Sequence, residues 1–388
     1  MVYKAVKAYK KYGVNLSRGN NQNKCKEIVS KTRDNIRKIV GADDNYEVAF
    51  CQSATYMINQ VLKGLDHSKI KTIYISQFEH NSVYRVVNRI KEEYGTTIQN
   101  LATKNYELDI DKIKEQFKEQ KPDLVIICHV SNVCGVIQKY EEVFACAKMY
   151  GSLTLLDSAQ SCGLLDINMC KHKVDITIFA GHKTLYGFTG IGGAVIRKGL
   201  KIKDLIQGGV GFDSANEKMP DNLPYKLEPG TQNILGIFSL YYSTNYILGL
   251  GKTRILQIEQ NNYIKLKEII KKSTVLNIID IKNSIGIIAC VPQKHYPDNY
   301  EEFFNKRNIS VRIGLQCSPL AHKTLGTFPA GTIRFSVGLL TKKKDLKVLE
   351  KAIKQLNKEF DSRVWFFITL FFLEKFGKNT CKIRTNVL

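Results

Sequence analysis

Short uninterrupted apolar runs alternate with helical segments over residues 24–200, and this alternation restricts the fold more than any other feature. The runs are continuous rather than alternating in polarity, which is typical of parallel strands covered on both faces. They lie at residues 47–50, 72–75, 123–130, 153–156, 175–179 and 193–196, with helical segments such as 82–93 and 140–150 between them. The pattern predicts a doubly wound α/β domain with a mostly parallel sheet.

The character of the chain changes after about residue 245. A helical segment that contains Ile255 and Ile258 precedes shorter strand-like runs at 286–291, 309–313 and 331–335, and a last helix is predicted at 344–360. This order predicts a smaller α+β domain. We therefore predict an N-terminal segment at 1–15, a large α/β domain at 16–245, a small C-terminal domain at 246–362 and an apolar, then basic tail at 363–388.

Composition limits the class of protein. The apolar fraction of 44% is too high for a disordered chain. The longest uncharged apolar run, residues 364–373, is shorter than the roughly 20 residues that a membrane helix needs. No basic-then-apolar signal segment opens the chain. We expect a soluble, cytoplasmic protein with no membrane partner.

The chain has 58 lysines and arginines but only 36 acidic residues, and the resulting net charge of +22 would suit a polyanionic binding partner. The lysines are scattered, however, and no aromatic-interleaved basic stripe accompanies them. We expect a solvated basic surface rather than a nucleic-acid site. The 10 cysteines include no C-x-x-C pair, so we predict reduced thiols and no metal centre.

Polar residues follow most of the predicted strands, where ligands collect in parallel α/β sheets. Asp157 directly follows a buried strand, and a carboxylate there would hold the protonated ring nitrogen of a cofactor or cap a helix. Lys183 follows a strand at a glycine-rich turn, where it is a candidate for a Schiff base or an ordinary surface lysine. The set comprises Ser53, Ala54, Thr55, His80, Asn132, Asp157, Gln160, His182 and Lys183.

Several of these segments together resemble a known family. LDSAQS at 156–161 and DITIFAGHK at 175–183 resemble the pyridoxal-phosphate core of the class V aminotransferases. FEHNSV at 78–83, HVSNV at 129–133 and VRIGLQC at 311–317 resemble its cysteine desulfurase-like branch. The resemblance spans residues 13–341 in the family's order. It implies the fold type I of pyridoxal-phosphate enzymes and pyridoxal 5′-phosphate as the cofactor.

The resemblance also implies roles for the residues around the cofactor ring. Lys183 would form the Schiff base with the cofactor, and Asp157 would pair with the ring nitrogen. His80 would stack on the ring, and Gln160 would donate to the ring oxygen. Asn132 would contact the cofactor or the substrate carboxylate.

Further residues would hold the cofactor phosphate. Ala54 and Thr55 open a helix whose free N–H groups and positive dipole end suit an anion. His182 would add a further contact with the phosphate. In this family the partner subunit completes the phosphate site, and Thr231 in the EPGTQN segment at 228–233 matches that contribution. The resemblance therefore implies a homodimer.

The resemblance also implies residues that would bind or attack the substrate. Arg334 resembles the arginine that binds the α-carboxylate of the amino acid, and Arg312 is a second candidate. Cys317 matches the cysteine whose thiolate attacks the substrate sulfur and becomes a persulfide. These residues imply a desulfurase that converts L-cysteine to L-alanine and transfers sulfur to an acceptor protein, for example in iron–sulfur cluster assembly.

The sequence also departs from the family pattern. The family's opening strand and its Asp-Asn-Ala-Ala-like segment are missing, which indicates an N-terminus that is shortened relative to the family. Ala180 replaces a phosphate-binding hydroxyl. Two alternatives therefore stay open: a selenocysteine lyase or another class V lyase or aminotransferase, and an inactive homologue that serves as a basic scaffold.

Overall fold

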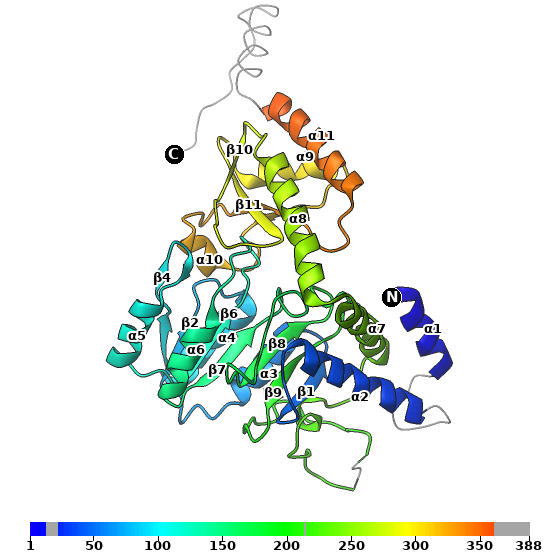
Figure 1. The fold of residues 1–388 in the computed structure, drawn as a ribbon. Helices are drawn as coiled ribbons and strands as arrows, with labels where there is room; N and C mark the ends of the chain where they lie inside the picture. The colour runs from blue at the N-terminus through cyan, green and yellow to red at the C-terminus, as the bar shows by residue number, and fades with distance from the viewer. Residues whose placement is uncertain (13–21, 213–214, 361–388) are drawn as a thin grey trace, which may run out of the picture.

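The computed structural model describes residues 1–12, 22–212 and 215–360, and it contains a large domain built on a seven-stranded sheet (Figure 1). The strand order is β1-β9-β8-β7-β6-β2-β3. From β8 to β3 all neighbours are parallel, whereas β9 and β1 are antiparallel to the strands beside them. The predicted mostly parallel sheet is confirmed. Its strands are β1 (Tyr46–Cys51), β2 (Thr72–Ile75), β3 (Thr97–Asn100), β6 (Leu124–Cys128), β7 (Leu153–Asp157), β8 (Ile176–Ala180) and β9 (Gly192–Arg197).

Helices cover both faces of this sheet, which explains why its central strands β6, β7 and β8 are mostly apolar rather than alternating in polarity. In β6, Val125 and Ile127 point into one core, whereas Leu124 and Ile126 point into the other. Helices α3 and α4 cover the second core, and α2, α5, α6 and α7 cover the first. Their bounds are α2 (Gln22–Ile39), α3 (Ala54–Gly64), α4 (Asn81–Tyr94), α5 (Ile110–Glu119), α6 (Tyr140–Met149) and α7 (Ile234–Leu250).

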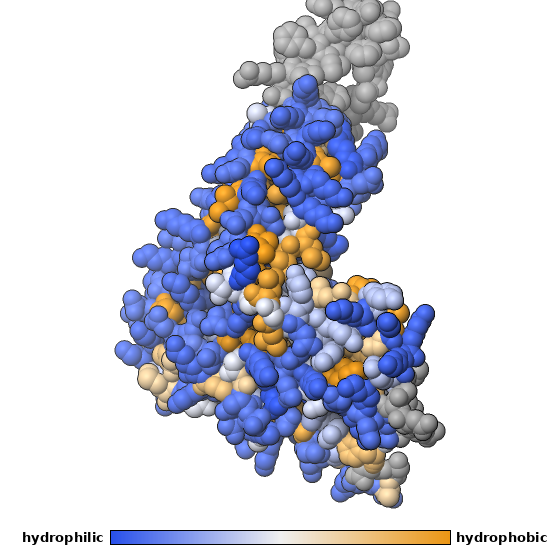
Figure 2. Space-filling model, turned by 45° about the vertical axis from the view of Figure 1, so that its right-hand side comes forward, coloured by the Kyte–Doolittle hydropathy of each residue, from blue (hydrophilic) through white to orange (hydrophobic). Residues whose placement is uncertain are grey.

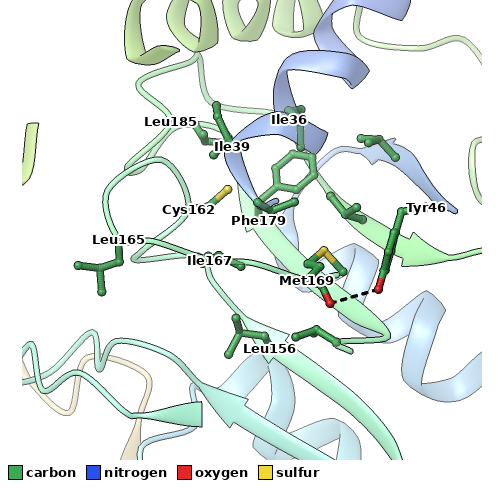
Figure 3. Close-up of a cluster of buried hydrophobic side chains, with 14 of the residues drawn as sticks. Ile36, Ile39, Tyr46, Leu156, Cys162, Leu165, Ile167, Met169, Phe179 and Leu185 are labelled. Carbon is green, nitrogen blue, oxygen red and sulfur yellow. Dashed lines mark hydrogen bonds between the residues drawn. The ribbon is translucent and has the colours of Figure 1, made fainter. Parts of the chain in front are cut away.

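Figure 3 shows part of the first core. Phe179 of β8 and Ile36 and Ile39 of α2 lie in one layer, and all three are fully buried. The hydroxyl of Tyr46 donates to the main-chain oxygen of Met169 at 3.3 Å, so the polar end of this buried ring is satisfied. This core fixes the strands whose carboxyl ends carry the candidate site.

The small domain contains a four-stranded antiparallel sheet in the order β10-β11-β13-β12. A separate core joins this sheet to α8, α9 and α11 (Figure 1). Residue 245, where we predicted the domain boundary, lies inside α7, and Gly251 separates α7 from α8. The elements are α8 (Lys252–Ile270), β10 (Leu276–Ile278), β11 (Ile287–Pro292), α9 (Glu301–Asn305), β12 (Arg312–Gly314), α10 (Pro319–Thr324), β13 (Thr332–Ser336) and α11 (Lys343–Phe360).

Some short elements carry no clear sequence signal. The strand β3 is exposed or half-buried at every position, and the two-residue strands β4 (Thr103–Lys104) and β5 (Glu107–Leu108) are too short to show a period. Helix α1 (Val2–Tyr12) buries Ala5 and Ala8 and packs against α7. The predicted boundary at residue 16 and the predicted tail at 363–388 lie outside the described residues.

The face in Figure 2 is mostly hydrophilic. Within the described ranges, the helices are too short or too polar to cross a bilayer.

Candidate active site

Asp157 marks the centre of the site at the carboxyl edge of the large sheet. It is the last residue of β7, it pairs in register with Cys128 of β6, and it is 5% exposed. One carboxylate oxygen accepts the N–H of Ala159 at 3.0 Å. This hydrogen bond orients the buried carboxylate at the end of the strand, and the carboxylate can still accept hydrogen bonds from a cationic partner.

His80 lies beside Asp157 at the start of α4. Its Nδ1 accepts the N–H of Ser82 at 3.1 Å, so in the neutral ring the proton is on Nε2. Burial lowers the pKa of His80, while Asp157 raises it and Lys183 lowers it. These three residues are therefore within electrostatic reach of one another, as the sequence predicts. A neutral ring is suited to stacking against a flat cofactor.

Lys183 lies on the turn after β8 and is half-buried. Main-chain hydrogen bonds hold this turn: Tyr186 donates to Lys183 at 3.0 Å, and Gly187 donates to Gly181 at 2.7 Å. The adjacent His182 is exposed at the surface, although partial desolvation of its ring and the charge of Lys183 lower its pKa. The lysine side chain is thus presented by a rigid turn that does not depend on the side chain itself.

Glu79 is a buried acid next to this cluster to which the sequence analysis assigned no role. It is 0% exposed, and its Oε1 accepts both the hydroxyl of Ser76 and the N–H of Cys128 at 2.6 Å. Its Oε2 is buried and has no hydrogen-bond partner among the described residues. Burial, with the Asp157 charge adding to it, raises the pKa of Glu79 to about 8. The signal in the sequence is an acidic residue between Phe78 and His80, shortly after the buried strand β2 ends at Ile75.

We predict that Glu79 makes the cofactor-free protein less stable as pH rises. The folded state holds this proton up to about pH 8, whereas the unfolded chain releases it near 4.5. Folding therefore takes up a proton between these values, and the group costs about 1.4 kcal/mol per pH unit across that window. Glu79→Gln mimics the neutral acid and should flatten this slope in urea denaturation at pH 5.5 and 8. An exposed control, Glu142→Gln, should keep the wild-type slope, and the same slope in all three proteins would contradict the prediction.

The N-terminus of α3 faces the same edge of the sheet. Ser53 caps this helix by accepting the N–H of Tyr56 at 3.2 Å, which leaves the N–H groups of Ala54 and Thr55 at the helix end. At Gly192 a Cβ would lie 2.7 Å from the main-chain nitrogen of Ala54, so β9 approaches the helix closely enough to require glycine. This end of α3 is suited to a phosphate.

A buried ion pair anchors the segment that contains Thr231. The guanidinium of Arg33 donates two hydrogen bonds of 2.8 Å to Glu228, whose side chain is 1% exposed. Glu228 also accepts the N–H of Phe50 at 2.6 Å. Thr231, three residues later, is exposed. The segment is therefore fixed at its start and presents Thr231 to the surroundings.

Arg334 and Arg312 are register partners on β13 and β12 of the small domain. Arg334 is half-buried and donates from Nη1 to the main-chain oxygen of Asn132 at 2.6 Å, which ties the two domains together. Its Nε is buried and has no partner within the described part of the chain. Burial and the neighbouring Arg312, which is exposed, lower the pKa of Arg334. A guanidinium that has no ion pair with an acidic residue of the described chain, and whose Nε is unsatisfied, is suited to binding a carboxylate.

Cys317 is exposed on a tight turn between β12 and α10. Both central residues have a positive φ, 41° at Gln316 and 59° at Cys317. For residues other than glycine this conformation costs about 1–2 kcal/mol each. The main-chain oxygen of Cys317 accepts the N–H of Asn81 at 2.7 Å, so the cysteine lies close to the residue that follows His80.

The structure therefore gathers six of the predicted residues in two connected groups. His80, Asp157 and Lys183 form one, and Asn132, Arg334 and the Cys317 turn form the other. The link between them is the contact of Asn81 with Cys317. Gln160 is half-buried near the end of β7. No contact among the described residues joins Thr231 to either group, and its role stays a prediction.

Comparison with known proteins identifies the family. The aminotransferase class-V profile matches residues 1–349, which is most of the chain. The chain belongs to the class V aminotransferase family. The resemblance that the motifs indicate is thus confirmed.

Several similar proteins are named cysteine desulfurase or probable cysteine desulfurase. A probable cysteine desulfurase of Pyrococcus abyssi is 28% identical over 374 residues, covering 90% of each chain. A cysteine desulfurase of Escherichia coli is 27% identical over 298 residues, covering 74% of this chain and 73% of the relative. The solved structure of a cysteine desulfurase from Thermococcus onnurineus NA1 matches with a TM-score of 0.82 and 25% identity, covering 92% of both chains. The fold is therefore that of the class V enzymes.

Proposed function

We propose that this class V protein is a pyridoxal-phosphate-dependent cysteine desulfurase. The observation that carries the proposal is the position of an exposed cysteine, Cys317. Its carbonyl accepts the N–H of Asn81, which follows His80, and its turn is joined to Arg334 through Asn132. Relatives named cysteine desulfurase, which match most of the chain, support the same activity.

The residues present fit the cofactor. A buried carboxylate at Asp157, a neutral ring at His80 and a half-buried Lys183 supply the donor set that a pyridinium aldehyde requires. The N-terminus of α3 supplies N–H groups for its phosphate. When bound, pyridoxal phosphate supplies an electron sink for the bonds at the amino acid's α-carbon.

Each residue of the site would then have its own role toward the cofactor or the substrate. Lys183 is the point of covalent attachment and moves protons at its Nζ, and Asp157 keeps the ring nitrogen protonated. Gln160 would donate to the ring oxygen, and His182 would contact the phosphate. Arg334 binds the α-carboxylate through the fork that includes its free Nε.

Cys317 performs the sulfur transfer in this scheme. Its thiolate attacks the sulfur of L-cysteine, a sulfur–sulfur bond forms, and the bond between the substrate sulfur and its β-carbon breaks. The electron pair stays on the carbon side, which takes up a proton and leaves as L-alanine. The exposed position of Cys317 leaves the persulfide accessible to a sulfur acceptor protein.

The proposed homodimer follows from Thr231. Its segment is anchored by Glu228 yet presents the threonine to solvent in the single chain, as a residue donated to a partner subunit would be. Sedimentation of the purified protein should give twice the chain mass, and a monomer that binds the cofactor with full affinity would contradict this part of the proposal.

The test of the function is the visible absorption spectrum of the purified protein with pyridoxal phosphate, before and after L-cysteine is added. We expect a visible band that shifts with L-cysteine, and one L-alanine released for each sulfur transferred. A loaded protein that binds L-cysteine but releases no L-alanine would refute the desulfurase. A protein that takes up no cofactor would favour the scaffold alternative.

A further inference from the structure

The turn that carries Cys317 has a conformation that its own sequence does not favour. Ser318 donates its N–H to the oxygen of Leu315 at 2.9 Å, and both residues between them have a positive φ. This is the pattern of a type I′ turn, in which glycine and asparagine are preferred at the central positions. Here those positions are Gln316 and Cys317. Contacts from outside the turn must therefore impose its shape.

Two residues of the large domain bind the turn from outside. The Nδ2 of Asn132 donates to the main-chain oxygen of Gln316 at 2.8 Å, and its Oδ1 accepts the hydroxyl of Ser318 at 2.8 Å. The main-chain N–H of Asn81 donates to the oxygen of Cys317 at 2.7 Å. Asn132 thus contacts both neighbours of the cysteine in the chain, and the cysteine's own carbonyl is held as well.

The side chain of Gln316 holds the turn from the small domain. It is 6% exposed, its Nε2 donates to the main-chain oxygen of Thr332 at 2.9 Å, and its Oε1 accepts the Thr332 hydroxyl at 3.2 Å. The Nε2 of His322 lies 3.1 Å from the same Oε1. Burial lowers the pKa of His322 to about 4, so its ring is neutral at physiological pH and donates one hydrogen to Gln316. With the main-chain oxygen of Arg312, which accepts Nε2 at 3.4 Å, Gln316 is therefore fixed by four groups of the small domain.

These contacts hold the backbone of Cys317 while leaving its side chain exposed. They also connect the turn to the substrate site, because the main-chain oxygen of Asn132 accepts Nη1 of Arg334 at 2.6 Å. One residue thus touches the guanidinium proposed to bind the substrate carboxylate and the turn that carries the proposed nucleophile.

We propose that Gln316 and Asn132 are positioning residues that hold the strained Cys317 turn, so that the thiol meets the substrate sulfur while Arg334 holds the carboxylate. This inference rests on the proposed desulfurase function, and it adds residues that act through Cys317 rather than on the substrate sulfur. Small displacements at a reacting atom are costly, since about 1 Å can lower a rate about 100-fold.

Gln316→Ala tests the proposal, with Gln293→Ala as the matched control. Gln293 is an exposed glutamine of the same domain whose side chain hydrogen-bonds only to Asn277 among the residues described. In cofactor-free protein, we expect hydrogen exchange in the peptide 312–324 to accelerate about 10-fold in Gln316→Ala and to stay unchanged in the control. In loaded protein, kcat for L-alanine release should fall about 10- to 100-fold. KM for L-cysteine and the spectral change on its addition should stay at wild-type values.

A lower kcat with an unchanged KM would distinguish a positioning role of Gln316 from a general loss of structure. If Gln316→Ala keeps the wild-type kcat and exchange rate, or loses cofactor binding and kcat in proportion, the proposal is wrong. Ser318→Ala, which removes only the hydroxyl that contacts Asn132, serves as the deciding variant if Gln316→Ala does not fold, and we expect the same split from it. A wild-type protein that releases no L-alanine would refute the desulfurase function, whereas the exchange experiment would still report on the turn.

Discussion

Lys183→Ala is expected to abolish the visible absorption band that pyridoxal phosphate gives with the wild-type protein. The variant removes the amine that would attach the cofactor and that would move protons during the reaction. Because acid–base catalysis alone contributes about 10²–10⁴-fold, we expect activity to fall at least about 10³-fold. The band is measured by titration with the cofactor, and activity by L-alanine release.

The fold around this substitution should persist. Main-chain hydrogen bonds between Gly181 and Gly187 and between Lys183 and Tyr186 hold the turn, and none of them uses the lysine side chain. Thermal unfolding of the cofactor-free variant should therefore match that of the wild type. Lys171→Ala, which alters an exposed turn lysine, should keep both band and activity. A Lys183→Ala protein with an unchanged band would remove this lysine from the attachment role.

Cys317→Ser should separate substrate binding from sulfur transfer. Serine is close to cysteine in size, so the turn and its contacts with Asn81 should persist. A hydroxyl is not ionised at neutral pH and is a poor nucleophile toward sulfur, in contrast to a thiolate. We expect normal cofactor binding and a normal spectral change with L-cysteine. Persulfide formation and L-alanine release should fall by at least about 10³-fold, the scale expected when a catalytic nucleophile is removed.

Cys170 provides the control for this experiment, since it is the other exposed cysteine in the part of the chain that the structure describes. Cys170→Ser should transfer sulfur at the wild-type rate. Persulfide is detected by mass spectrometry of the labelled peptides, which also shows which cysteine carries it. Full L-alanine release from Cys317→Ser would instead indicate a lyase that does not use this cysteine.

Most of the large domain could be predicted because its signals are local. Strands β6, β7 and β8 are buried on both faces, so every residue in them tends to be apolar and the run is visible without tertiary information. The residues that follow these strands must gather at one edge, which is why Asp157 and Lys183 could be assigned to one site. Strand β3 and the β4–β5 hairpin could not be predicted, since exposed short strands carry little hydrophobic pattern.

The protonation of Glu79 and the conformation of the Cys317 turn have a different origin. Glu79 is read from the sequence as an ordinary charged residue, and only its complete burial near Asp157 raises its pKa. Asn132 anchors the turn through hydrogen bonds to Gln316 and Ser318, which follow it in the chain by 184 and 186 positions.

The sequence alone thus determined the layered α/β architecture, the family and the chemical type of each candidate residue, because periodicity and motif spacing are properties of neighbouring residues. The tertiary structure determined that Glu79 keeps its proton and that Cys317 is exposed on a strained turn. Both depend on desolvation and on hydrogen bonds between segments that are distant in the sequence, which arise only in the folded chain.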